Sequence, residues 1–206
     1  MNRESITIKK WQLWKRLAII VSLAAAFWFL NFHLVASNTP LEKNISTTGI
    51  GVEDSLPDAM QRREKINLVL VGEGPLTTAL QKAMIIEMNN AGIGNTELVQ
   101  RIEPRYQSPV LVINVGRPGL LWTPFFAMSR FTIQAGYSSI GDTTFMGETQ
   151  VAVDNQAGPV LHMYGEFKVS DRSWGLISRP GYYQSLADYL ARQIVATMRD
   201  LYRVST

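Results

Sequence analysis

Cysteine is absent from this chain of 206 residues, and histidine occurs only twice. Without cysteine the protein has no disulfide bond, no thiolate nucleophile and no cysteine-ligated metal, and it cannot be lipidated on an N-terminal cysteine as bacterial lipoproteins are. Of the two histidines, His33 lies in an apolar stretch and only His162 falls in the remaining chain. Because a catalytic triad or a metal site needs histidine close to other reactive groups, we expect no enzymatic activity, no metal and no cofactor.

An excess of positive charge is missing outside the N-terminus. Residues 1–36 carry five basic residues and one acidic residue, whereas the remaining chain carries 15 basic and 16 acidic residues. The net charge of +3 therefore belongs to the N-terminal segment. A nearly neutral remainder lacks the basic surface that binding to a phosphate backbone requires, so we expect no nucleic-acid partner.

Glycine-rich catalytic motifs are also missing. Gly72-Glu73-Gly74 follows a β-rich run, but the third glycine of a dinucleotide-binding loop is absent. A tight turn between a strand and a helix is the better interpretation. Residues 136–141 do not have the GxSxG spacing of a nucleophile elbow, so their serines are interpreted as turn residues.

One long apolar run is present at residues 17–36, after a basic segment. As a helix it would be about 30 Å long, which matches the hydrocarbon core of a bilayer. The positive-inside rule keeps the basic tail, residues 1–16, in the cytoplasm. We therefore predict a single-pass transmembrane helix at 17–36 in the inner (cytoplasmic) membrane, with all later residues periplasmic or extracellular. Residues expected at the membrane interface are Trp11, Trp14, Lys15, Arg16 and Trp28.

A cleaved signal peptide is the alternative for this segment. The apolar core is short, and Ala36 is the kind of small residue that precedes a cleavage site, which would release the protein as a secreted one. The long basic segment and its tryptophans favour a retained anchor. In both cases the lipid bilayer is a partner of residues 17–36.

The rest of the chain divides into a linker and one domain. Residues 37–65 are polar and rich in turn-forming residues without periodicity, which predicts a linker. Residues 66–206 carry the periodic patterns: strands are predicted at 66–71, 97–102 and 109–115, helices at 75–88 and 182–203, and an antiparallel meander between Phe125 and Val169. Residues 174–177 add a short edge. The predicted fold class is α+β, with a mostly antiparallel sheet of about six strands and two helices on one face.

The loop from Arg117 to Phe126 holds several large apolar residues between two prolines. Loops are usually polar, so these side chains either fill the core or contact a partner protein or a membrane. Residues 179–183 repeat the Arg-Pro-Gly turn followed by bulky side chains. If both turns open at one end of the sheet, their aromatic residues form one patch suited to protein binding. The predicted partner-binding residues are Arg117, Leu120, Leu121, Trp122, Phe125, Tyr182 and Tyr183.

A second candidate site is the polar face of a strand that carries His162, Tyr164 and Glu166. Alternate residues of a strand lie about 6.6 to 7 Å apart on one face, so these side chains could serve a tethered hydrolase or a small-ligand site. The simpler interpretation is a solvated sheet face, because one histidine is little support for catalysis.

The element order over residues 66–203 resembles that of small bacterial envelope assembly domains. Similar layouts occur in the N-terminal domain of the translocation protein TolB, in the curli-secretion lipoprotein and in the lipopolysaccharide-assembly lipoprotein, with residues 75–88 and 182–202 as the two helices. The cysteine of those lipoproteins is absent here. The resemblance implies a binding or assembly role, and it assigns no functional residue. We therefore predict an accessory subunit whose domain binds another envelope protein.

Overall fold

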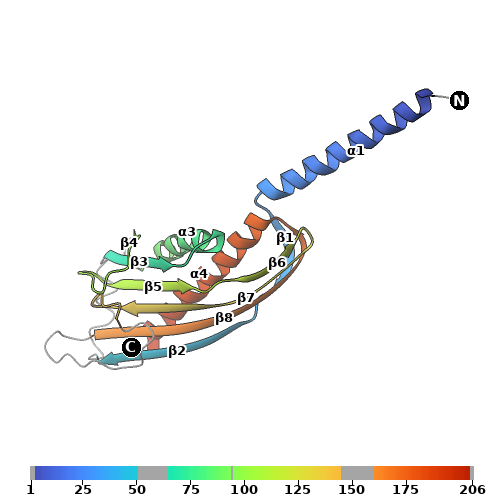
Figure 1. The fold of residues 1–206 in the computed structure, drawn as a ribbon. Helices are drawn as coiled ribbons and strands as arrows, with labels where there is room; N and C mark the ends of the chain where they lie inside the picture. Colours follow the sequence, from blue (N-terminus) through green and yellow to red (C-terminus); the bar gives the residue numbers. More distant parts are fainter. Residues whose placement is uncertain (1–2, 51–64, 94, 145–159, 205–206) are drawn as a thin grey trace.

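The computed structural model describes residues 3–50, 65–93, 95–144 and 160–204 (Figure 1). A long helix at the N-terminus is followed by strands and by two further helices. In chain order the elements are α1 (Arg3–Phe29), β1 (His33–Asn38), β2 (Leu41–Ile50), β3 (Lys65–Val71), α3 (Pro75–Asn90), β4 (Asn95–Val99), β5 (Val110–Val115), β6 (Gly119–Thr123), β7 (Phe126–Ser138), β8 (Val160–Ile177) and α4 (Arg179–Val204).

Helix α1 differs from the predicted membrane anchor. It ends at Phe29, so the helical part of the apolar run covers residues 17 to 29, or 13 residues. Such a segment is about 20 Å long, which is shorter than a bilayer core. None of the helices in the described ranges is long and apolar enough to cross a membrane. The predicted transmembrane helix at 17–36 and the inner-membrane localisation that depended on it are therefore wrong.

The first residues after α1 belong to the sheet. Strand β1 includes Ala36, the residue considered as a signal-peptide cleavage site, and Ala36 pairs with Trp174. Strand β2 pairs with β8 along its whole length, from Leu41 opposite Val169 to Ile50 opposite Val160. The structure thus places residues 41–50 of the expected linker in the sheet, while residues 51–64 lie outside the described ranges.

The sheet has eight strands and is mixed, in contrast to the predicted antiparallel sheet of about six strands. Its main order is β1-β8-β7-β5-β3-β4, with β2 also paired to β8 and β6 also paired to β7. Strand β3 runs parallel to both β4 and β5, and the other pairs are antiparallel. Residues 174–177, expected as a separate edge, are the end of β8. The expected meander strand around residues 145–153 lies outside the described residues.

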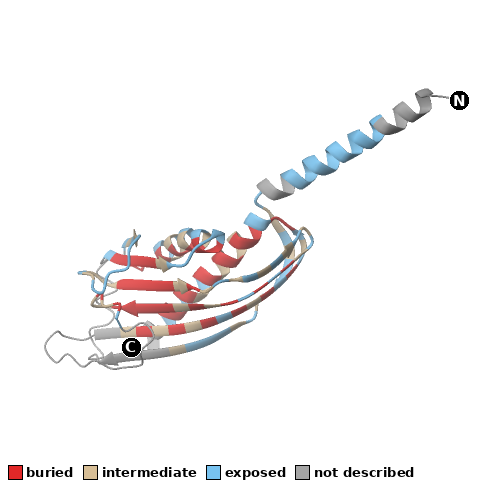
Figure 2. Ribbon diagram, viewed as in Figure 1, coloured by how far each residue is buried: buried red, intermediate tan, exposed pale blue. Residues whose placement is uncertain are grey.

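Helices α3 and α4 pack side by side and supply one wall of the main hydrophobic core (Figure 2). In α3 the buried side chains recur at three- and four-residue steps, because these positions share one helix face. They meet the inward-facing residues of the central strands, and β5 is buried almost throughout, as its continuous apolar sequence predicts. Core residues from these elements include Leu80, Met84, Leu111, Ile113, Ile133, Phe167, Leu190 and Ile194.

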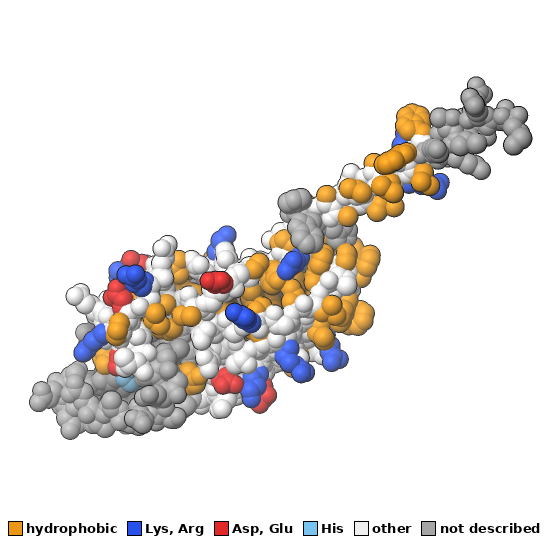
Figure 3. All heavy atoms as spheres, viewed as in Figure 1, with side chains coloured by type: hydrophobic (Ala, Val, Ile, Leu, Met, Phe, Trp, Pro, Cys, Tyr) orange, Lys and Arg blue, Asp and Glu red, His pale blue; other side chains and the backbone are white. Residues whose placement is uncertain are grey.

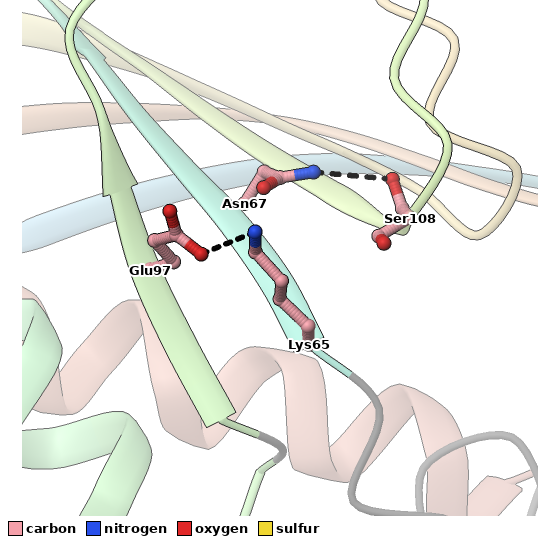
Figure 4. Close-up of polar contacts among 4 residues, drawn as sticks. All are labelled: Lys65, Asn67, Glu97 and Ser108. Atoms are coloured by element: carbon pink, nitrogen blue, oxygen red, sulfur yellow. Dashed lines mark hydrogen bonds and ion pairs between the residues drawn. The ribbon is translucent and has the colours of Figure 1, made fainter.

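Polar contacts hold β3 between its two parallel neighbours at the far edge of the sheet (Figure 4). Lys65 of β3 forms an ion pair with Glu97 of β4, and both side chains are half-exposed. On the other side Asn67 donates its backbone N–H to Pro109 O at 2.8 Å, and its side-chain amide lies 3.5 Å from Ser108 O. The exposed ion pair contributes little, about 0 to 1 kcal/mol, so the backbone pairing carries this edge.

The chain that leaves α1 is attached to the start of α4. Ser178 accepts hydrogen bonds at its Oγ from the N–H groups of Phe32 (2.9 Å) and Gly181 (3.1 Å), and it donates its own N–H to Phe32 O (3.0 Å). The backbones are so close here that a Cβ on Gly181 would lie 2.2 Å from Phe32 O. Only glycine fits at position 181. The hydrogen bonds between Phe32 and Ser178 place the start of β1 against the N-terminus of α4.

Candidate protein-binding surface

A buried carboxylate, Asp171, lies on the helix side of β8, next to the end of β1 at Asn38. Asp171 is only 1% exposed. Its Oδ1 accepts hydrogen bonds from Ser37 (3.0 Å) and Thr39 (2.5 Å), and its Oδ2 accepts from Ser173 (3.0 Å) and Tyr182 (2.6 Å). Four hydroxyl donors from β1, the turn after it, β8 and α4 thus compensate one charge. The burial of an ion is tolerated only with such compensation.

Tyr182 extends this network into the core. Its hydroxyl also lies 2.9 Å from Ser129 Oγ of β7. Burial, and next the hydrogen bond to Asp171, raise the pKa of Tyr182 far above its usual range, so it remains a neutral donor. The ring of His33 lies 6.3 Å from that of Tyr182, and burial lowers the pKa of His33 although the negative charge of Asp171 opposes this shift.

A cavity of about 260 Å³ borders this network, and its lining includes His33, Asp171, Tyr182, Tyr189 and Arg192. The four donors described above already occupy both carboxylate oxygens of Asp171. Tyr189 also uses its hydroxyl within the protein, since it donates to Thr39 O at 3.0 Å. Asp171, bonded to Ser37, Thr39 and Tyr182, and Tyr189, bonded to Thr39, therefore hold β1 and the turn after it against α4.

The opposite, outer face of the same strand ends carries apolar side chains. Residues that pair directly across antiparallel strands point to the same face. One row of such pairs joins Phe126 of β7 to Trp174 of β8, whose rings are 4.3 Å apart, and then to Ala36 of β1. The next row joins Leu176 to Leu34.

A third row joins Leu121 of β6 to Met128 of β7. Phe125 follows in the turn between these strands and is 65% exposed. Hydrophobic side chains consequently gather at the end of the domain from which α1 emerges (Figure 3). We define the outer apolar patch as Leu34, Leu121, Phe125, Phe126, Met128, Trp174 and Leu176; Trp174 is 63% and Leu34 71% exposed.

The loop residues predicted to bind a partner divide between the two faces. Leu121 and Phe125 belong to the outer apolar patch, and Arg117 is exposed just before β6. Leu120 and Trp122 alternate to the other side of β6 and pack, partly buried, against the core. Trp122 is therefore a poor probe of binding, because its truncation would also remove core packing.

The two tyrosines of the second Arg-Pro-Gly turn do not reach the surface. Tyr182 and Tyr183 are 1% and 7% exposed and belong to the core. The turn itself begins α4 at the end of the sheet where β1 starts (Figure 1). Trp174 takes the place of these tyrosines as the exposed aromatic residue, and the alternation of β8 beyond Val169 was the signal that could have identified it.

Among the residues expected at a membrane interface, Trp11 and Trp14 are exposed on α1. The Nζ of Lys15 lies 4.0 Å from the ring centroid of Trp11, in a cation–π contact. Arg16 is also exposed, and the side chain of Trp28 lies outside the described residues.

His162, Tyr164 and Glu166 share the outer face of β8, as the alternation predicted. They lie opposite Thr48, Ser46 and Asn44 of β2. Burial lowers the pKa of His162, opposed by the charge of Asp142, and burial and then Glu166 raise the pKa of Tyr164. In the described part of the chain, no group of His, Asp and Glu residues could hold a metal ion.

A groove of about 440 Å³ lies farther along this face, where Pro40 separates β1 from β2. Its lining includes Arg130, Thr132, Lys168 and Ser170. Neither this groove nor the cavity at Asp171 is lined by His162, Tyr164 or Glu166.

No family model matches this sequence, and no curated protein matches it. Among solved structures, the chain is similar to a minor lipoprotein from Acinetobacter baumannii, with a TM-score of 0.30 and 16% sequence identity. The match covers 66% of this chain and 96% of that chain. A TM-score this low supports no conclusion about function.

Replacing Asp171 with Ala should lower the free energy of unfolding by about 3 kcal/mol, because the buried hydroxyl groups of Ser173 and Tyr182 and the half-buried one of Thr39 lose their acceptor. Urea denaturation measures the change. The matched control is Glu42→Ala, which removes an exposed carboxylate 3.8 Å from Lys168 and should cost less than about 1 kcal/mol. Equal effects of the two substitutions would contradict the role of Asp171.

The two histidines predict a loss of stability in mild acid. Each has a pKa below the value of 6.5 in the folded state. As pH falls through 6.5 the unfolded chain binds protons first, so the free energy of unfolding decreases until the folded-state pKa values are passed. The double variant His33→Gln/His162→Gln should lose less stability between about pH 7.5 and 5.5 than the wild type. Parallel pH profiles of the two proteins would refute this origin.

Proposed function

We propose that this protein is an accessory or assembly subunit of the bacterial cell envelope whose α+β domain binds another envelope protein through the outer apolar patch. The envelope assignment rests on the element order expected from the sequence over residues 66–203, which resembles that of envelope assembly domains. The binding role rests on the patch itself.

The observation that supports binding most strongly is an inversion of polarity at one end of β7 and β8. The helix side of these strand ends holds Ser129, Asp171 and Ser173, which are at most 1% exposed. The outer side holds Met128 and Trp174. A sheet face exposed to water normally has the reverse arrangement, so contiguous apolar side chains on it indicate a surface that a partner covers.

The composition of the outer apolar patch suits a protein interface. The tilted rings of Trp174 and Phe126 are in contact across two strands. Large aromatic residues provide most of the binding energy at many interfaces. The patch residues lie on paired strands, except for Phe125 in a tight turn, so little conformational entropy is lost when a partner binds.

The rival function, a hydrolase or ligand-binding domain that uses His162, Tyr164 and Glu166, gains no specific support. Their pKa shifts follow from partial burial between neighbouring strands. The two cavities described above lie elsewhere.

The substitution Trp174→Glu should abolish recovery of a stoichiometric partner when the tagged full-length chain is purified in mild detergent. It places a charge at the centre of the outer apolar patch, where a partner would have to desolvate it. Its effect on stability should stay within about 1.5 kcal/mol, because Trp174 is largely exposed and loses mainly its ring contact with Phe126.

The matched control is Ile86→Glu, since Ile86 is 55% exposed on α3, outside the patch. This variant should recover the partner as the wild type does. Recovery of the same partner by Trp174→Glu would refute the proposed interface.

A further inference from the structure

We infer that the segment which binds the outer apolar patch is an acidic peptide segment, with apolar side chains on the patch and carboxylates on Arg130 and Arg172. This inference rests on the proposed function and adds the chemistry of the partner. It comes from the placement of these two cations, from the lack of compensating charge around them, and from the groove that begins at Arg130.

The two arginines border the patch directly. Arg172 of β8 pairs with Met128 of β7, and Arg130 pairs with Ser170. Paired residues share a face, so both guanidinium groups belong to the outer side, and they are diagonal neighbours about 7 to 8 Å apart at the backbone. Arg172 thus lies in the same row as Leu121 and Met128 of the patch, and Arg130 lies in the next row along the same strands.

Their positive charge is not compensated within the described residues. Both arginines are exposed, and no carboxylate of the described ranges lies within ion-pair distance of either one. Asp171 is adjacent in sequence to Arg172, but it faces the helix side and is bonded to four hydroxyl groups. Lys168, farther along the same face, is different, because Glu42 and Glu166 lie 3.8 and 4.0 Å from its Nζ.

The groove beside Arg130 gives an extended segment room to continue. It has a volume of about 440 Å³ and lies where Pro40 interrupts the pairing along β8. In an extended peptide, alternate side chains lie about 6.6 to 7 Å apart on one side. Successive rows of paired residues on β7 and β8 have a similar spacing, because they are two residues apart along each strand. A peptide with apolar side chains on the patch can therefore place its next side chain on the same side, a carboxylate, at Arg172 or Arg130.

The test uses two short fluorescent peptides and the full-length chain. One peptide has leucine or phenylalanine at two alternate positions and glutamate at the next two alternate positions, with serine between them, so that an extended chain presents all four on one side. The other peptide has lysine in place of every glutamate. Fluorescence anisotropy measures binding to the wild type, to Arg130→Glu, to Arg172→Glu and to the control Lys82→Glu, which changes an exposed cation of α3. Binding of the wild type to vesicles of anionic phospholipid and binding of both peptides to Trp174→Glu are measured in parallel. Circular dichroism confirms that each variant is folded.

We expect the wild type to prefer the glutamate peptide. Each arginine variant should bind it about fivefold more weakly, while Lys82→Glu binds it as the wild type does. Equal binding of both peptides, no binding of either, or arginine variants that bind like the wild type would overturn the inference. Binding to vesicles but not to peptides would overturn it in favour of a lipid surface.

The outcomes separate this inference from the proposed function. If Trp174→Glu loses both peptides while the arginine variants retain them, the patch binds protein without charge selection, and only the inference fails. If the arginine variants lose the glutamate peptide while Trp174→Glu retains it, the arginines bind an acidic segment without the patch. The proposed function of the patch then fails, and so does the placement of apolar side chains on it.

Discussion

The buried carboxylate of Asp171 is the constraint on which the arrangement of this end of the domain depends. A charge that is 1% exposed must be compensated by hydrogen bonds, and the donors come from separate parts of the chain. Ser37 and Thr39 follow α1, whereas Tyr182 lies on α4, near the C-terminus. The hydrogen bonds to Asp171 therefore fix β1, β8 and α4 relative to one another. At the start of β1, the Oγ of Ser178 accepts from the N–H groups of both Phe32 and Gly181 and so also joins β1 to α4.

This constraint explains why the segment after α1 was misjudged from its sequence. Its polar, hydroxyl-rich composition is that of a linker, and nothing local marks Ser37 or Thr39 as donors to a residue more than 130 positions away. The apolar run before it predicts one continuous helix through Ala36. Its last residues instead form β1, because pairing with β8 satisfies their backbone groups and places Ser37 next to Asp171.

Local periodicity predicted the elements that bury one regular face. The apolar positions of α3 and α4, the short run that became β3 and the continuous run of β5 were all identified with nearly correct bounds. The parallel pairing of β3 with β4 and β5, and the length of β8, depend on contacts between distant segments, which no local pattern encodes. The candidate site shows the same limit of local sequence patterns. Two aromatic residues after Arg-Pro-Gly do not indicate whether their side chains point to the core or to the surface, and Tyr182 and Tyr183 are buried in the core.

The inverted polarity at the ends of β7 and β8 is not the result of a shifted register. The same two strands direct Phe131, Ile133 and Phe167 into the core, and a slip of one residue would bury Arg130 and Lys168 in their place. With the register fixed by that core, the strand ends must expose Trp174 and Met128 as long as Asp171 and Ser129 occupy the inner side. The polar side chains around Asp171 on the inner side and the outer apolar patch therefore follow from the same strand register. A partner that binds the patch would stabilise the folded domain by covering these apolar side chains.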